Sequence, residues 1–412
     1  MNTRFRFMVV FVGAAALVGM VSVIAAQAQG DEPSTPTPAP SVREEADAPA
    51  APQSDPNVAW TVGEITFTSN FPAGFSFTAE ISSGAGPIER GRVIWSHAPG
   101  TQRSRPIEVD ADTGLVRSAW DATDADAVPP WVGVTYYFDV GDAAGNSFQT
   151  EPQFAEYEDT SREWVRTEGE DIIVFAYNLP PDVGPMTVEA MAQQRETYRG
   201  AWGELLPYTP RAILFGDRAA YLEWQITPAN PRSIGTTRSD WGSTVQVVSG
   251  GNVYDLAYGT VLHEVGHLYQ SEYTIMAVDW FNEGNATFFE LNQQYDYERR
   301  VRLMAANGTL PTILQGTGPS IRGQNGRDGY DIGYTFWKWW TDTYGLEGHR
   351  ELIDLLDLGV GRIEAIETVS GMSAAQVEQE WRIWLGASPI PPTLIPTPTT
   401  YFVPIATPDL RQ

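Results

Sequence analysis

Two of the four histidines in this 412-residue chain, His263 and His267, stand four positions apart, and Glu264 directly follows the first of them. The pattern of apolar residues from Asp255 to Gln270 predicts a helix around them. Positions i and i+4 lie one turn apart on the same face of a helix, so both imidazoles can reach a single metal ion. The alternative is a helix whose histidines pack against neighbours or face solvent. The spacing therefore predicts a helix here and favours a metal site.

The residue types on this helix fit zinc. Neutral imidazole is a good zinc ligand, and a third, carboxylate ligand would leave one coordination position open for water. Water in such a position has a pKa of about 7, and Glu264 stands where it can accept the proton. The chain has no cysteine, which excludes disulfides, thiolate catalysis and cysteine-ligated metals. The motif thus predicts a hydrolase with Glu264 as general base.

A second motif runs from Trp280 to Glu290 and reads Trp-Phe-Asn-Glu-Gly-Asn-Ala-Thr-Phe-Phe-Glu. It resembles the gluzincin zinc metallopeptidases, in which H-E-x-x-H is followed by a helix that carries W-x-N-E-G-x-A. The resemblance implies that Glu283 is the third zinc ligand beside His263 and His267. Glu290 is then expected to orient a zinc-bound histidine, as ligating imidazoles generally require. The alternative for Glu290 is an ordinary solvated glutamate.

A third match, Tyr330-Asp331-Ile332-Gly333, is similar to the Y-x-x-G with which the aminopeptidase branch of the gluzincins opens a later helix. It implies that Tyr330 donates its hydroxyl to the oxyanion of the tetrahedral intermediate, a role worth a factor of about 100 to 1,000 in rate. Tyr334 lies one turn further and is the alternative donor, and either ring can instead pack between helices. The G-x-M-E-N segment with which aminopeptidases grip a free amine does not occur here, so the direction of cleavage stays open.

The resemblance is good from about Ala257 to Leu385 and loose over the segment before it. The C-terminal part, with Gly371-Met372-Ser373, resembles the peptidase-MA-like families, which are bacterial members of the same clan. The resemblance implies Zn2+ as the cofactor and a peptide or protein as the substrate.

Residues 1–28 have the layout of a targeting segment. Arg4 and Arg6 precede an apolar run over residues 7–26, and Ala-Gln-Ala at its end forms a small-x-small cleavage site. The segment is therefore predicted to be a signal peptide, which makes the protein secreted or cell-surface. Membrane anchoring through an uncleaved segment is the alternative, because the run is close to the roughly 20 residues that span a bilayer.

Two further stretches are rich in proline and poor in large apolar residues, namely 29–57 with alanine and acidic residues and 387–412 with threonine. Such compositions bury too little apolar surface to offset the entropy of ordering. The first is predicted to be a disordered linker and the second a disordered tail.

Residues 58–157 show short apolar runs with a two-residue period. Phe75 and Phe77 alternate with polar neighbours, residues 134–140 are rich in β-branched and aromatic side chains, and Asp-Ala-Ala-Gly-Asn at 142–146 predicts a tight turn. About seven strands over about 100 residues indicate an immunoglobulin-like or fibronectin-like β-sandwich. Such modules usually bind, space or pack rather than catalyse.

Residues 164–386 mix both periods, which predicts an α+β domain with a helical C-terminal half. With the resemblance, this becomes a zincin-like metallopeptidase domain in a multidomain chain. Strands are expected at 171–177, 211–215 and 243–248, the last of them at the edge of the sheet, where an extended substrate can pair with it. Helices are expected at 187–205, 255–270, 282–305, 330–344, 348–358 and 373–384.

Charge restricts the partners. The chain has 26 Lys and Arg against 52 Asp and Glu, a formal net charge of -26, which repels phosphates, so we expect no nucleic acid partner. The sequence does not predict the oligomeric state. The expected function is an exported zinc metallopeptidase. The alternatives are a non-catalytic cell-surface binding or adhesion protein with a zincin-like scaffold, and a zinc hydrolase that acts on another bond.

Overall fold

The computed structural model describes residues 57–97, 102–110, 113–122, 128–223, 235–248, 252–273, 278–315, 318–322 and 326–389. The predicted signal peptide at 1–28, and nearly all of the predicted linker at 29–57 and tail at 387–412, lie outside these ranges. Within the described ranges, no helix is both long and apolar enough to cross a membrane.

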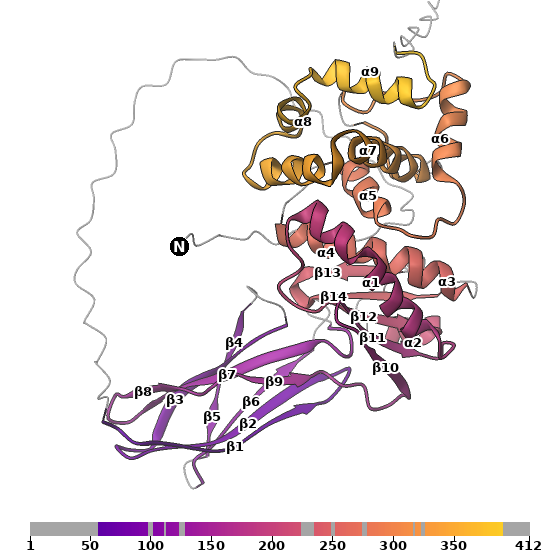
Figure 1. Ribbon diagram of the computed structural model, residues 1–412. Coiled ribbons are helices and arrows are strands. Elements are labelled where there is room, and N and C mark those ends of the chain that lie inside the picture. The colour runs from indigo at the N-terminus through magenta and orange to yellow at the C-terminus, as the bar shows by residue number, and fades with distance from the viewer. Residues whose placement is uncertain are drawn as a thin grey trace, which may run out of the picture.

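The strands from β1 to β9 form two antiparallel sheets, which we call together the β module (Figure 1). The first sheet has the order β1-β2-β6-β5 and consists of β1 (Trp60–Ser69), β2 (Gly74–Ser83), β6 (Leu115–Asp121) and β5 (Glu108–Val109). The second has the order β4-β3-β7-β8, with β9 also paired to β7, and consists of β4 (Arg103–Pro106), β3 (Ile88–Ser96), β7 (Gly133–Asp142), β8 (Ser147–Gln149) and β9 (Gln153–Glu156).

Alternate residues of these strands meet between the two sheets. The rings of Phe75 and Phe77 on β2 lie 5.9 and 5.7 Å from that of Trp95 on β3. The ring of Tyr136 on β7 lies 4.9 Å from that of Phe77, and all four side chains are buried. Large aromatic side chains supply much of the stability of such a core. The two-residue period of the sequence therefore corresponds to packing of one sheet on the other.

A third sheet has five strands in the order β10-β11-β12-β14-β13. It consists of β10 (Trp164–Glu168), β11 (Ile173–Tyr177), β12 (Arg211–Phe215), β14 (Ser243–Val247) and β13 (Gly235–Arg238). The three central strands are parallel to one another, and the two outer strands are antiparallel to their neighbours.

The edge position expected for residues 243–248 is wrong. β14 is paired on one side with β12 and on the other with β13, and all five of its residues are buried. The edge strand is β13, whose sequence Gly-Thr-Thr-Arg has no large apolar residue and therefore gives no strand signal.

Helices follow and interleave with the third sheet. They are α1 (Val183–Trp202), α2 (Arg218–Glu223), α3 (Val253–Asp255), α4 (Val261–Tyr273), α5 (Asp279–Phe288), α6 (Tyr297–Ala306), α7 (Arg327–Asp357), α8 (Arg362–Ser370) and α9 (Ala374–Trp384), with a 3-10 turn at Ser239–Trp241 and a π-helical turn at Leu256–Thr260. α7 is two helices that meet at Gly345, where φ is 72° and ψ is 177°. The separate helices expected at 330–344 and 348–358 are thus confirmed.

The single helix expected at 282–305 is wrong. α5 ends at Phe288 and α6 begins at Tyr297. Between them, the N–H of Asn292 donates to the carbonyl oxygen of Tyr258 at 2.9 Å, so a tertiary hydrogen bond replaces the helical one. The break lies just after the second motif.

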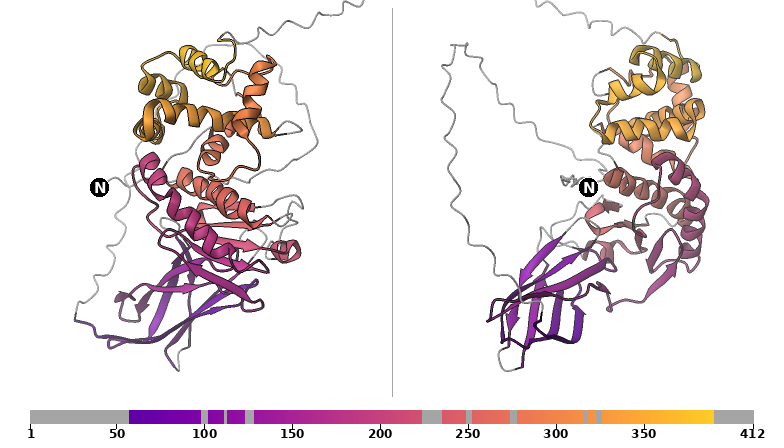
Figure 2. Two further views of the ribbon diagram at one scale, coloured as in Figure 1. Left: turned by 45° about the vertical axis from the view of Figure 1, so that its right-hand side comes forward. Right: turned by 60° about the vertical axis from the view of Figure 1, so that its left-hand side comes forward.

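The third sheet separates two hydrophobic cores. Val174 and Leu214 belong to the core that includes α1 and α4, whereas their neighbours Phe175, Ile213 and Phe215 belong to the core of the β module. Successive residues of a strand point to opposite faces, so each strand contributes to both cores. Figures 1 and 2 show the resulting order, with the β module on one side of the sheet and most of the helices on the other. α2 is the exception, because its Ala220 and Tyr221 belong to the core of the β module.

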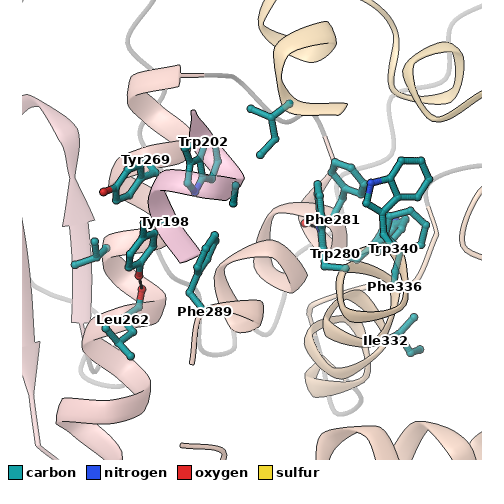
Figure 3. Close-up of a cluster of buried hydrophobic side chains, with 14 of the residues drawn as sticks. Tyr198, Trp202, Leu262, Tyr269, Trp280, Phe281, Phe289, Ile332, Phe336 and Trp340 are labelled. Atoms are coloured by element: carbon teal, nitrogen blue, oxygen red, sulfur yellow. Dashed lines mark hydrogen bonds between the residues drawn. The ribbon is translucent and has the colours of Figure 1, made fainter. Parts of the chain in front are cut away.

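Aromatic packing fixes α4 within the helical core (Figure 3). The ring of Tyr198 on α1 stacks on those of Tyr269 and Phe289, at centroid distances of 4.7 and 4.4 Å. The Tyr198 hydroxyl donates to the carbonyl oxygen of Leu262 at 2.6 Å. α4, the helix that carries both motif histidines, is therefore held against α1 by stacked aromatic rings and by a hydrogen bond.

Candidate metal centre

α4 presents the first motif because its apolar residues fix its rotation. Val261, Leu262 and Val265 are fully buried in the helical core. With these positions inside, His263 and His267 project from the same face, one turn apart. Both histidines are 9% exposed.

Glu283 on α5 meets both histidines. Its Oε2 lies 3.2 Å from Nε2 of His263 and 3.4 Å from Nε2 of His267. One donor atom from each of the three residues lies within 4.8 Å of the others, and this is the only such group of three that the described residues contain. Two imidazole nitrogens and one carboxylate oxygen are the donor set of a catalytic zinc site, so the residues present fit the metal.

The second nitrogen of His263 faces another carboxylate. Its Nδ1 lies 3.0 Å from Oε1 of Glu290, and Oε2 of Glu290 accepts from the hydroxyl of Tyr297 at 3.0 Å. Glu290 is therefore the partner of a motif histidine, as expected from the sequence, and not a solvated glutamate. Such a contact selects the imidazole tautomer whose Nε2 is free to bind a metal.

The corresponding nitrogen of His267 has a partner that sequence reasoning missed. Its Nδ1 lies 2.8 Å from Oε1 of Gln270, three residues later on α4. Residues three apart on a helix are neighbours, so the spacing itself is a signal that can be used to find this contact.

Glu264 faces the edge of the third sheet. The hydroxyl of Thr237, on the edge strand β13, donates to Oε2 of Glu264. A Cβ atom built on Gly235 of the same strand would lie 3.6 Å from Oε1 of Glu264. The candidate base thus stands between the histidine pair and β13. Because β13 gave no strand signal, sequence reasoning did not find Thr237.

Tyr330 at the start of α7 lies beside the cluster, and Tyr334 does not. The ring of Tyr330 lies 6.0 Å from that of His263. The pKa of the Tyr330 hydroxyl is raised by burial and by the negative charges of Glu283 and Glu264. Burial also raises the pKa of Tyr334, but the charged side chains that act on it belong to Lys338, Glu298 and Asp342. Of the two tyrosines, Tyr330 therefore packs on a motif histidine, whereas the ring of Tyr334 packs on that of Tyr297 at 5.8 Å.

In the cluster, the glutamate carboxylates and the histidine imidazoles stabilise each other's charged forms. Burial alone would lower the pKa of His263, but the carboxylates of Glu283 and Glu290 outweigh it and raise that pKa to about 10. The pKa of His267 is raised in the same way, chiefly by Glu283. Burial opposes ionisation of Glu283, yet the two histidines hold its pKa well below the usual range. A metal ion that binds here replaces these protons and takes over the charge pairing.

Small residues of the motifs are the points where the helices touch. A Cβ atom on Gly284 would lie 2.2 Å from the backbone carbon of Gly333, and one on Gly266 would lie 3.1 Å from Cα of Ala286. α5 therefore crosses both α4 and α7 at backbone contact distance, which is possible only without larger side chains. These crossings place Glu283 against the histidines and Tyr330 next to them.

The structure therefore brings together His263, Glu264, His267, Glu283 and Tyr330. Their assignments as zinc ligands, general base and oxyanion donor stay predictions. His97 lies in the β module, outside the cluster. Burial there lowers the pKa of its imidazole to about 4.

No family model matches this sequence, and no curated protein matches it. Among solved structures, it is similar to the M1 zinc metallopeptidase from Deinococcus radiodurans, with 15% identity over 81% of this chain and 95% of that chain and a TM-score of 0.32. A mutant of that peptidase bound to a Tyr-Ser-Ala substrate gives 14% identity, 81% and 96% coverage and a TM-score of 0.31. The aminopeptidase N family protein from Idiomarina loihiensis gives 10% identity, 81% and 72% coverage and a TM-score of 0.27. Identities and TM-scores this low assign no family.

Proposed function

We propose that this chain is an exported zinc metallopeptidase that hydrolyses peptide bonds. The observation that supports it most is the convergence of three donor atoms, from His263, His267 and Glu283, beside the carboxylate of Glu264. Two imidazoles, one carboxylate ligand and a separate carboxylate base are the set of groups that metal-assisted amide hydrolysis requires.

His263, His267 and Glu283 would hold the zinc ion, which when bound supplies Lewis acidity toward the attacking water and the scissile carbonyl. Glu264 accepts a proton from that water and returns it to the leaving amine. The Tyr330 ring lies 6.0 Å from that of His263, and a tyrosine is protonated at neutral pH, so its hydroxyl is available to stabilise the oxyanion.

The edge strand β13 offers a place for the substrate backbone. Its inner side pairs with β14, while Thr237 on the same strand contacts Glu264. An extended peptide that adds to the outer side of β13 would run past the candidate base. We therefore transfer the substrate-pairing hypothesis from residues 243–248 to residues 236–238 of β13.

A set of peptides tests this pairing without altering the protein. We expect that N-methylation of one or two backbone positions near the cleaved bond raises KM, because a methylated amide cannot donate to a strand edge. The matched control is the same peptide with a methyl group added to the side chain of that residue. If N-methylation at every position leaves KM unchanged, the substrate does not pair with β13.

Export and surface location rest on residues 1–28, and the β module would position the enzyme or its substrate near the cell surface. The Pro-rich stretch 29–57 would serve as a tether between residues 1–28 and the β module.

The decisive experiment compares the wild type with Glu264→Gln. Zinc content and cleavage of a mixed peptide library are measured for both, with Glu272→Gln on the same helix as the matched control. We expect all three proteins to bind zinc, and Glu264→Gln alone to lose cleavage, by a factor of at least about 100. Zinc binding without cleavage by any of them favours a non-catalytic surface protein. Absence of zinc binding by the wild type refutes the proposal.

A further inference from the structure

A chain of buried hydrogen bonds leads from His267 into the helical core. From Nδ1 of His267 to Oε1 of Gln270 the distance is 2.8 Å, and from Nε2 of Gln270 to Oδ1 of Asn285 it is 3.1 Å. Nδ2 of Asn285 then lies 3.0 Å from Nε2 of His349, and Nδ1 of His349 lies 2.9 Å from the hydroxyl of Thr341. Gln270, Asn285 and His349, which we call the relay, are 4%, 0% and 0% exposed.

The direction of every hydrogen bond in the relay follows from one peptide carbonyl. Nε2 of Gln270 donates to the carbonyl oxygen of Asn282 at 2.8 Å, and a carbonyl oxygen can only accept. The amide of Gln270 is therefore oriented with Oε1 toward His267, so Nδ1 of His267 must carry the hydrogen. When a metal ion takes the place of the other ring proton, the lone pair of His267 is therefore on Nε2, the nitrogen that faces Glu283.

The same constraint propagates toward His349. Nε2 of Gln270 also donates to Oδ1 of Asn285, so the Asn285 amide must turn its NH2 group toward His349. Nε2 of His349 must accept, and its hydrogen must be on Nδ1, where it donates to Thr341. A neutral imidazole meets both conditions, and burial lowers the pKa of His349 to about 3.

We propose that Gln270, Asn285 and His349 are positioning residues that fix the tautomer and orientation of His267 for metal binding, an inference that rests on the proposed function. His263 is held by the carboxylate of Glu290, whereas His267 is held by a neutral amide whose own orientation is set by α5 and α7. The relay therefore connects the second histidine of α4 to α5, which carries Glu283, and to α7, which carries Tyr330.

A packing role for His349 would be the simpler explanation, since its ring lies 4.4 Å from that of Trp337 and 5.2 Å from that of Phe288. Two substitutions separate packing from hydrogen bonding. His349→Phe fills the aromatic site and removes both hydrogen bonds. His349→Gln fills it less well, but its amide oxygen reaches the position of Nε2 and can accept from Asn285.

The experiment measures the zinc dissociation constant of the full-length apoprotein by competition with a chromophoric chelator, alongside thermal unfolding in EDTA. We expect His349→Phe and Gln270→Ala to weaken zinc binding about 10- to 100-fold, the range for outer partners of a metal ligand. His349→Gln is expected to keep zinc affinity closer to that of the wild type than His349→Phe does, although the phenylalanine variant is the more stable of the two. Visible absorption of the Co2+-loaded proteins checks whether the ligand geometry changes in the same order.

His97→Phe in the β module is the matched control and should leave zinc affinity unchanged. Equal zinc affinity for the wild type, His349→Phe and Gln270→Ala, with all of them folded, overturns the relay while leaving the proposed function intact. The relay is also overturned if zinc affinity follows stability, that is, if His349→Phe binds zinc more tightly than His349→Gln does. A weakened His349→Phe in a protein that cleaves no peptide supports the relay and counts against the peptidase. A wild type that binds no zinc overturns both.

Discussion

Glu264 and Glu290 carry the same side chain beside the same histidine helix, but their surroundings suit them to different tasks. Both oxygens of Glu290 are engaged, one by His263 and one by the hydroxyl of Tyr297. A carboxylate held at both ends can orient an imidazole but has little freedom to move a proton. Glu264 is held through Oε2 by the hydroxyl of Thr237 on the edge strand and not by a motif histidine, which leaves it the better placed of the two to act as a base.

A carboxylate far from the candidate site gives the pH dependence of stability. Asp159 lies between β9 and β10, and its side chain is 1% exposed. It accepts hydrogen bonds from the Ser161 hydroxyl at 2.5 Å, from Nη1 of Arg162 at 2.7 Å and from the Trp164 indole at 3.2 Å. Burial opposes its ionisation, but these donors outweigh burial and lower its pKa.

Asp159→Asn is therefore expected to destabilise the protein by about 2 to 3 kcal/mol at pH 7, since hydrogen bonds to a charged group are lost. A lowered folded pKa means that the stabilisation is present above the unfolded pKa of about 3.9 and is lost as pH falls through the folded value. Urea unfolding of both proteins between pH 3 and pH 7 measures the difference. A gap that stays constant over this range contradicts the assignment.

Most of the candidate site at this scale could be predicted from the sequence. His263, Glu264 and His267 follow from one spacing, while Glu283 and Tyr330 needed a family pattern. Gln270, Asn285 and Thr237 were missed because their importance depends on which tertiary neighbour they meet. An amide or hydroxyl has no distinctive spacing until the elements around it are placed.

At the scale of elements, the crossing of α5 and α7 determines the distance between Glu283 and Tyr330. The crossing is made by Gly284 and Gly333, whose backbones are in contact. Each of these glycines belongs to one of the sequence motifs. Their place in the motifs is thus explained by helix packing, which sets the geometry of the neighbouring functional side chain.

Gly333→Ala tests this. The new Cβ atom would lie 2.2 Å from the carbonyl oxygen of Trp280 and 2.7 Å from Cα of Gly284, so the helices must separate. We expect a loss of about 1 to 3 kcal/mol from overpacking, together with weaker cleavage because Tyr330 moves away. Gly361→Ala is the control, since a Cβ atom there meets nothing within 4 Å and φ is -60°. Thermal unfolding and kcat are measured on the same samples, and equal values for both variants would refute the argument.

Elements were predictable where one local pattern dominates. α9 begins with the capping box of Ser373 and Gln376, and α7 breaks at Gly345, as local signals indicated. The continuous helix across 282–305 failed because a hydrogen bond to Tyr258, distant in sequence, ends it. β13 failed because an edge strand of glycine, threonine and arginine has no apolar face to reveal it.

For the whole molecule, the β module and the third sheet form one core. The indole of Trp131, in the loop before β7, stacks on the ring of Phe175 at 4.9 Å and 10°. Nη1 of Arg211 on β12 donates to the carbonyl oxygen of Trp131 at 2.5 Å and to Glu156 at 2.7 Å. These contacts make independent motion or independent unfolding of the two parts costly.

Phe175→Ala should therefore destabilise both parts together. Phe175 is fully buried, and removing such a ring costs about 3 to 5 kcal/mol. We expect a single unfolding transition shifted to lower urea, with faster hydrogen exchange in β7 as well as in β11. Val165→Ala, at a position 48% exposed on β10, serves as control and should change stability by less than about 0.5 kcal/mol. Faster exchange confined to the third sheet would show that the two parts unfold separately.

The two-sided use of β11 and β12 has a consequence for how the chain finds its fold. A slip of one residue in either strand would exchange Val174 for Phe175, or Ile213 for Leu214, between a helical and a β environment. The slipped strand would then pack poorly against both cores. The register of β11 and β12 is therefore constrained from both faces, by the helices on one and by the β module on the other.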